Sequence, residues 1–385
     1  MGLIPRACDA SPAAPRRVVA LDAARSLGVV AMVFGHTLDA LLSVEARACP
    51  LMVEYWKARG FTAPLFLLVA GWTVTLAVGR SRARGLGIAQ ERLPRVLLLL
   101  AVGYGLRFPG WNLPALLAGD PVVWQHFLAF DALHAIAVGL LAVAIVLGLP
   151  WRRRAAAGVL LVLLGALAVV LTPATPGEPP QNLATLALWE ATGGTSPFPL
   201  LPWLAYFFAG GAVGLLAPGD PMKRAAVLGG VGVTLVAATC WQGVGTMPPA
   251  EPALVLYRVG AILALLAALG ACPVRIAAAL APLGRASLGI YALHVAIVYG
   301  WCRVEGLASR IGPSLGLGEA ASVALLVLVC SALIHRALRV ASAVAAAGIR
   351  RARMRATLTC SAALAHCRPP SPRRRKSRPS PQHLL

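Results

Sequence analysis

The chain has 385 residues, of which 58% are hydrophobic and only 13% are charged, and its mean hydropathy is +0.76. A soluble domain carries about a quarter charged residues, so this composition excludes a soluble enzyme and predicts an integral membrane protein. The net charge of +21 does not indicate nucleic-acid binding, because residues 341–385 hold ten Lys or Arg with no Asp or Glu, and the other cations lie mostly in short loops.

Ten apolar segments follow one another along the chain, separated by Pro, Gly and charged residues. They cover residues 18–42, 61–79, 94–108, 127–149, 155–172, 197–217, 225–241, 253–271, 286–301 and 319–340. Most are close to the roughly 20 residues that an α-helix needs to cross a bilayer. The third is short and ends in a stretch rich in Gly and Pro, and residues 109–126 are expected to form an interfacial segment. The sequence therefore predicts an all-α, polytopic integral membrane bundle of about ten transmembrane helices.

The basic residues alternate between loops, which indicates how the chain is oriented. With both termini in the cytoplasm, the loops rich in Lys and Arg all lie inside, as the positive-inside rule requires. We expect a cytoplasmic N-terminal segment over 1–17, a transmembrane domain over 18–340, and a basic, largely disordered cytoplasmic tail over 341–385 that is attracted to anionic lipid. The cations expected on the other side are few, namely Arg47, Lys57, Arg59, Arg107, Arg303 and Arg310.

The first apolar segment carries four ionisable residues, which are costly inside a membrane and indicate a functional site. At about 100° per residue, Asp22, Arg25, His36 and Asp39 share one helix face. Asp22 and Arg25 lie near the cytoplasmic end, where they are candidates for substrate binding or simply form an ion pair. His36 and Asp39 lie near the outer end, where we expect the carboxylate to orient the imidazole as a general base.

The fourth apolar segment carries a second carboxylate and imidazole near its outer end. Asp131 and His134 are i, i+3 neighbours, and a carboxylate beside an imidazole fixes its tautomer and raises its basicity. We therefore expect His36, Asp39, Asp131 and His134 to gather in the outer half of the bundle as catalytic residues. His134 could instead be a satisfied polar residue between helices.

Further polar residues occur in the eighth and ninth apolar segments. Ser287, Tyr291 and His294 are spaced i, i+4 and i+7, and so form one stripe, while Arg258 lies near an outer helix end. We take all four as candidate substrate-binding residues. The alternatives are helix packing for the stripe and a buried ion pair for Arg258.

Several common types of site are absent from the sequence. The eight cysteines include no CxxC pair, so neither a zinc site nor a disulfide framework is indicated, and we expect no metal. Phosphate-binding GxxxxGK[ST], GxGxxG, HExxH and GxSxG motifs are also absent, which disfavours ATP-driven transport, zinc proteolysis and serine-elbow hydrolysis. A membrane-embedded histidine and carboxylate site remains.

Five segments occur in an order that is typical of one family. They are RRVVALDAARSLGVVAMVFGHTLDALL, FTAPLFLLVAGWTV, FDALHAIAVGLL, PWLAYFFAGGAVG and LGRASLGIYALHVAIVYG. Together they resemble the bacterial branch of the heparan-alpha-glucosaminide N-acetyltransferase catalytic-domain family over roughly residues 16–301. The first segment also resembles the wider membrane acyltransferases in the spacing of Asp22, Arg25 and His36.

The resemblance implies an acyltransferase that moves an acetyl or related acyl group from acetyl-CoA, or another acyl-CoA, to an acceptor at the opposite membrane face. It implies that His36 is the functional histidine and Asp22 with Arg25 a charged pair, with His134 as a competing candidate for the key base. A bacterial member would be a multi-pass protein of the inner (cytoplasmic) membrane, surrounded by lipids. Its acceptor would be a small molecule or glycan of the cell envelope, its partners would not include nucleic acid, and its state could be oligomeric.

Two other functions use the same types of residue. A proton-coupled transporter or flippase for an envelope metabolite also needs intramembrane Asp and His side chains, although no repeated halves are detected in the sequence. A degenerate relative that only scaffolds a complex is the other alternative.

Overall fold

A computed structural model describes residues 18–83, 87–110, 112–172, 187–188, 196–243 and 251–366. The N-terminal segment expected over 1–17 and the end of the basic tail from residue 367 lie outside these residues. The chain divides into two compact units, Met1–Ala332 and Leu333–Leu385. The second unit holds the later part of the last helix.

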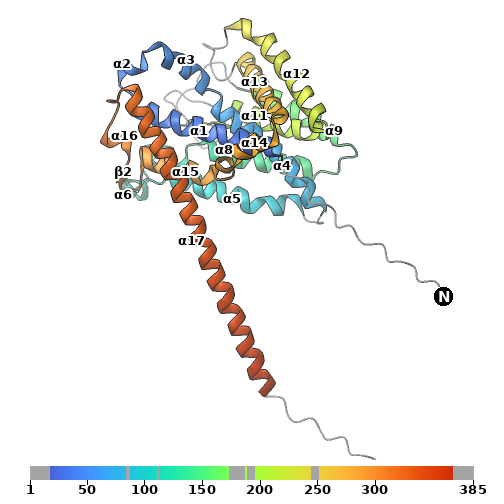
Figure 1. Cartoon of the computed structure of the whole chain (residues 1–385), viewed down its shortest axis with the longest axis vertical. Helices are drawn as coiled ribbons and strands as arrows, with labels where there is room; N and C mark the ends of the chain where they lie inside the picture. Colours follow the sequence, from blue (N-terminus) through green and yellow to red (C-terminus); the bar gives the residue numbers. More distant parts are fainter. Residues whose placement is uncertain are drawn as a thin grey trace, which may run out of the picture. The chain divides into compact units, whose positions relative to one another are not determined.

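The described residues form helices joined by short connections, with one two-stranded hairpin (Figure 1). The elements are α1 (Val19–Leu41), α2 (Val44–Arg47), α3 (Pro50–Arg59), α4 (Thr62–Ala83), α5 (Ile88–Leu106), α6 (Leu113–Leu117), α7 (Pro121–Leu128), α8 (Ala132–Gly148), α9 (Arg154–Val170), α11 (Leu200–Leu216), α12 (Pro221–Thr239), η1 (Cys240–Gln242), α13 (Pro252–Ala271), α14 (Val274–Arg285), α15 (Ser287–Tyr299), β1 (Gly300–Trp301), β2 (Val304–Glu305), α16 (Leu307–Arg310) and α17 (Leu317–His366).

Each of the ten predicted apolar segments coincides with one of these helices. Among the described residues, four helices are long and apolar enough to cross a membrane, and the number rises to six if each of two bent helix pairs counts as one span. Shorter apolar helices cover Thr62–Val78, Arg154–Val170 and Leu200–Leu216. Large apolar side chains such as Leu97, Val162 and Val231 are exposed on α5, α9 and α12, as expected of helices that face lipid.

Two parts of the chain differ from the predicted pattern. Residues 274–285, expected as a cytoplasmic loop because Arg275 and Arg285 interrupt the apolar run, form helix α14, which is bent by 53° from α15. The predicted interfacial segment 109–126 contains α6 and most of α7, and α7 is bent by 56° from α8, with which it could form one span. Helix α17 continues from the predicted last span into the basic tail and ends at His366.

Helix α1 is half buried and packs against α4, α13, α14 and α15. The Ser26 hydroxyl of α1 accepts a hydrogen bond from the Gly284 backbone N–H at 2.6 Å and donates one to the Asp22 carbonyl at 3.1 Å. The absence of a side chain at Gly284 lets α14 approach the α1 backbone at this point. These contacts position the junction between α14 and α15, and therefore the start of α15, against α1.

Helices α4 and α11 cross with their backbones in close contact. A methyl group on Gly71 would collide with the Phe207 carbonyl, and one on Gly210 would collide with the Leu68 carbonyl. Small residues allow this approach, and van der Waals contact is the main attraction between helices in lipid. The crossing therefore supports the buried residues of α4 that pack against α1.

We expect Gly210→Ala to destabilise the fold by about 1–3 kcal/mol, because the two backbones must separate to admit the methyl group. The measurement is the melting temperature of the detergent-purified protein. Gly230→Ala on α12 is the matched control, since no atom lies within 4 Å of the added methyl group. The control should be neutral or slightly stabilising because Ala favours helix. Equal melting temperatures for the two variants would contradict the close crossing.

Candidate functional site

Imidazole, phenol and carboxylate groups from three helices follow one another through the first unit. We call this set the polar row, and it consists of Tyr299, His36, His294, Tyr291, Asp131 and His134. Helix α1 contributes one member, α15 contributes three, and the start of α8 contributes two. The predicted residues His36, Asp131 and His134 are thus connected through residues of the ninth apolar segment.

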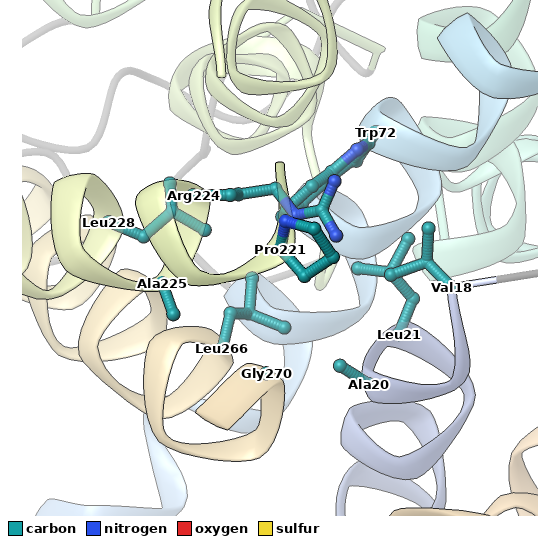
Figure 2. Close-up of a pocket in the computed structure, with 10 residues that line it drawn as sticks. All are labelled: Val18, Ala20, Leu21, Trp72, Pro221, Arg224, Ala225, Leu228, Leu266 and Gly270. Atoms are coloured by element: carbon teal, nitrogen blue, oxygen red, sulfur yellow. The ribbon is translucent and has the colours of Figure 1, made fainter. Parts of the chain in front are cut away.

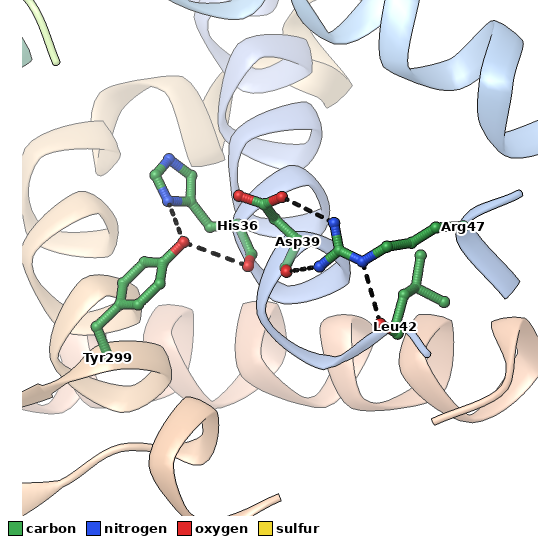
Figure 3. Close-up of polar contacts among 5 residues, drawn as sticks. All are labelled: His36, Asp39, Leu42, Arg47 and Tyr299. Carbon is green, nitrogen blue, oxygen red and sulfur yellow. Dashed lines mark hydrogen bonds and ion pairs between the residues drawn. The ribbon is translucent and has the colours of Figure 1, made fainter. Parts of the chain in front are cut away.

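His36 and Tyr299 form the first end of the polar row. The Tyr299 hydroxyl lies 3.1 Å from His36 Nδ1 and 3.5 Å from the His36 carbonyl oxygen (Figure 3). Tyr299 is exposed by 43%, whereas the His36 ring is half buried. The next ring is that of His294, whose centroid lies 5.3 Å from that of His36 in an edge-on arrangement. Two imidazoles from different helices are therefore neighbours.

Tyr291 and Asp131 join α15 to α8. The Tyr291 hydroxyl donates a hydrogen bond to Asp131 Oδ1 at 2.8 Å, and the same oxygen accepts the Ala132 backbone N–H at 2.6 Å. Asp131 is thus the N-cap of α8, where a carboxylate satisfies an otherwise unpaired helix N–H. The Tyr291 ring also contacts the His294 ring, with centroids 5.7 Å apart. This carboxylate therefore holds α15 against the first turn of α8.

Arg107 is a charged neighbour of the polar row that the sequence did not single out. It caps the end of α5, donates a hydrogen bond to the His126 carbonyl at 2.8 Å, and interacts electrostatically with Asp131 and Tyr291. In the sequence it is one of a few cations in outer loops, and no spacing relates it to a carboxylate 24 positions later. Only the fold brings this guanidinium close to the row.

The second end of the polar row is His134, whose bonding differs from the prediction. Its Nδ1 accepts the backbone N–H of Asp131 at 3.1 Å, so the backbone rather than the carboxylate fixes the tautomer. In the neutral ring the proton then lies on Nε2, which is buried and has no hydrogen-bond partner among the described residues. The ring packs on Gly103 and lies 4.2 Å from the Tyr104 ring, centroid to centroid. His134 is therefore arranged as a hydrogen-bond donor and not as a base.

Asp39 has a different environment from the one predicted. Its carboxylate forms an ion pair with Arg47 at 3.3 Å, and Arg47 also donates to the backbone carbonyls of Asp39 and Leu42 (Figure 3). The guanidinium neutralises the carboxylate near the C-terminal end of α1. The Tyr299 hydroxyl lies within hydrogen-bond distance of His36 Nδ1, so Tyr299 is one of the groups that orient this ring.

Asp22 and Arg25 form the predicted ion pair, at 3.7 Å, and Arg25 donates to the Thr73 hydroxyl at 2.8 Å. At 1.5 Å per residue, Arg25 lies about 17 Å along α1 from His36, so the structure does not bring the two together. Arg258 on α13 lies against Gly60, and no carboxylate of the described residues is within ion-pair distance of it. Ser287 is half buried at the start of α15, one turn before Tyr291.

A separate apolar pocket lies at the first turn of α1, between this helix, α12 and α13 (Figure 2). It includes Trp72 and Arg224, and none of the predicted site residues lines it. The described residues also contain no group of three His, Cys, Asp or Glu side chains that could hold a metal ion. The polar row, which contains the predicted residues His36, His134 and His294, is therefore the candidate functional site.

Comparison with known families shows what the chain is similar to. The sequence model of the family described as "Heparan-alpha-glucosaminide N-acetyltransferase, catalytic" matches residues 17–247. No curated protein matches the chain. The matched region contains His36, Asp131 and His134, whereas Tyr291 and His294 lie beyond its end.

We expect Asp131 and Tyr291 to be energetically coupled, because the phenol donates to a carboxylate. A hydrogen bond to a charged group contributes about 1.5–3 kcal/mol. Asp131→Asn retains an N-cap side chain and removes the charge, so a cycle with Tyr291→Phe measures how much the carboxylate charge strengthens the contact between α8 and α15. The measurement is the free energy of unfolding in mixed micelles.

The control cycle combines Asp131→Asn with Tyr257→Phe, a tyrosine of α13 that contacts Phe61. Its two effects should be additive. A coupling between Asp131 and Tyr291 no larger than that of the control would show that the carboxylate charge does not strengthen the contact between α8 and α15.

Proposed function

The chain belongs to the heparan-alpha-glucosaminide N-acetyltransferase catalytic family, and we propose that it transfers an acetyl group from acetyl-CoA to an acceptor at the outer face of a membrane. The family and the apolar helices indicate an integral membrane acetyltransferase. The donor, the acceptor and the reacting residues are our proposal. The acceptor is a hydroxyl or amine of a small molecule or glycan, or of a glycolipid, in the cell envelope.

The observation that supports this function is the pairing of His36 with His294 inside the polar row. Acetyl transfer from a thioester requires a group that removes the proton of the incoming hydroxyl or amine, and donors that stabilise the oxyanion. An imidazole performs the first task near neutral pH. Tyrosine hydroxyls and the Nε2–H of His134 are donors of the type needed for the second. The row therefore supplies both kinds of group within one connected set.

The donor would reach the site from the cytoplasm. Arg95, exposed on α5, and the arginines around residues 80–92 are suited to attract the phosphates of CoA. Asp22 and Arg25 lie near the same end of α1, on the route toward His36, and would contact the donor and not the acceptor. Arg258 and Ser287 remain proposed substrate-binding residues.

We further propose ten transmembrane helices with both termini in the cytoplasm, in the inner membrane of a bacterium. The ten helical apolar segments and the distribution of Lys and Arg support this topology. Shorter helices such as α9 and the bent pairs are included as spans, since local thinning of the bilayer and snorkelling of flanking residues accommodate short apolar stretches. The partners would be membrane lipids and the acceptor, with no nucleic acid, and the topology is compatible with an oligomer.

We expect the purified protein to transfer labelled acetyl from acetyl-CoA to a glycan or glycolipid fraction of a bacterial envelope. His36→Ala should lower kcat by about 100-fold or more, because the ring helps to position the reacting groups and a misplacement of about 1 Å can cost about 10²-fold. Combining it with His134→Ala should abolish transfer. His126→Ala changes an exposed histidine of α7 and is the control, with full activity. Full turnover in the double variant would exclude the proposed site.

Reporter fusions test the proposed topology. A fluorescent protein fused after Leu385 should fluoresce, and alkaline phosphatase fused at the same position should be inactive, because both report a cytoplasmic terminus. Phosphatase inserted after Ala118, between α6 and α7, should be active on the outer side. An active phosphatase at the C-terminus would contradict the proposed topology.

A further inference from the structure

His36 and His294 are neighbouring imidazoles, and His294 is the more deeply buried of the two. Its side chain has no exposed surface, and it lies in the middle of α15 between the rings of His36 and Tyr291. The sequence pattern alone made it a candidate for substrate binding or for helix packing. The hydrogen bonds of its two ring nitrogens favour a different role.

The backbone of α15 fixes the tautomer of His294. Its Nδ1 lies 3.0 Å from the Ile290 carbonyl oxygen, which can only accept a hydrogen bond, so Nδ1 carries the proton. In the neutral ring Nε2 then has a free lone pair. This atom is buried and has no hydrogen-bond partner among the described residues. A histidine that serves only in packing would normally have its second nitrogen satisfied as well.

The two buried histidines thus have opposite tautomers. His134 accepts at Nδ1 and has its proton on Nε2, whereas His294 donates from Nδ1 and has a basic Nε2. His36, between His294 and the exposed Tyr299, has its Nδ1 within hydrogen-bond distance of a phenol. Of the two buried histidines, His294 is the one whose Nε2 is prepared to accept a proton.

We propose that His294, through Nε2, is the general base of the acetyl transfer; this inference rests on the proposed function. Nε2 takes the proton of the acceptor hydroxyl or amine as the acceptor atom forms a bond to the acetyl carbonyl carbon. The tetrahedral intermediate then collapses, the carbon–sulfur bond breaks, and the departing CoA thiolate takes the proton from the His294 imidazolium. The products are the acetylated acceptor and free CoA, and the base returns to its neutral form. His36 and Tyr299 position the acceptor.

Two variants separate a base from a residue that only supports the fold. His294→Asn keeps a side-chain N–H close to the position of Nδ1, so it can still donate to Ile290, but it lacks a basic nitrogen. His294→Ala removes both groups and leaves a space that can admit free imidazole. We expect kcat to fall by about 100-fold or more in both variants, with imidazole restoring a measurable part of it in His294→Ala only. His126→Gln is the control and should keep wild-type activity.

Melting temperatures, measured on the same detergent-purified samples, report the structural contribution. If the His294→Asn variant has the stability and the turnover of the wild-type protein, the residue acts through its bond to Ile290 and the proposal is overturned. It is also overturned if imidazole does not raise the turnover of a folded His294→Ala protein. Absence of acetyl transfer in the wild-type protein would instead overturn the proposed function, so the two failures are distinguishable.

Discussion

Several polar side chains of α1 bond to neighbouring helices inside a largely apolar bundle, and these contacts position the helices that surround α1. Burying an unpaired polar or charged group costs several times what a hydrogen bond contributes in water. Arg25 therefore bonds to Thr73 of α4, Ser26 to the backbone of α14, and His36 to Tyr299 of α15. These contacts fix α4, α14 and α15 around α1, while glycine residues let the backbones approach closely.

Contacts of the same kind bring imidazole, phenol and carboxylate side chains together from distant parts of the chain. The matched family region ends at residue 247, yet the polar row depends on α15, whose Tyr291 and His294 connect His36 to Asp131. The site is thus assembled from both halves of the first unit. Its polar groups are joined by ring contacts and hydrogen bonds, and the fixed tautomers give its two buried histidines different capacities. In our account this difference separates a proton acceptor from a hydrogen-bond donor.

The sequence predicted the helices well, because long apolar segments bounded by Pro, Gly and charge leave few alternatives in a membrane protein. The ion pair of Asp22 with Arg25, which the sequence left as an alternative to substrate binding, is present, and Asp131 and His134 are neighbours as their spacing indicated. The sequence did not predict α14, because Arg275 and Arg285 interrupt the apolar run as loop residues do. It also did not predict that Arg107 lies close to Asp131. The tautomer of His134 was also beyond prediction, because Asp131 acts on the ring through its backbone N–H and not through its carboxylate. Such features depend on tertiary contacts, which the spacing of residues along the sequence does not reveal.

We propose that acetyl transfer takes place at the His36 and His294 pair. The most direct measurement is a cryo-electron microscopy structure of the protein in a lipid nanodisc with a non-transferable acetyl-CoA analogue. We expect the carbon of the analogue that represents the acetyl carbonyl to lie beside these two imidazoles. It should be within about 3.5 Å of the place that the attacking oxygen or nitrogen of the acceptor would occupy, as a reactive geometry requires. An analogue whose acetyl group is bound elsewhere, for example in the pocket beside Trp72 and Arg224, would contradict the account.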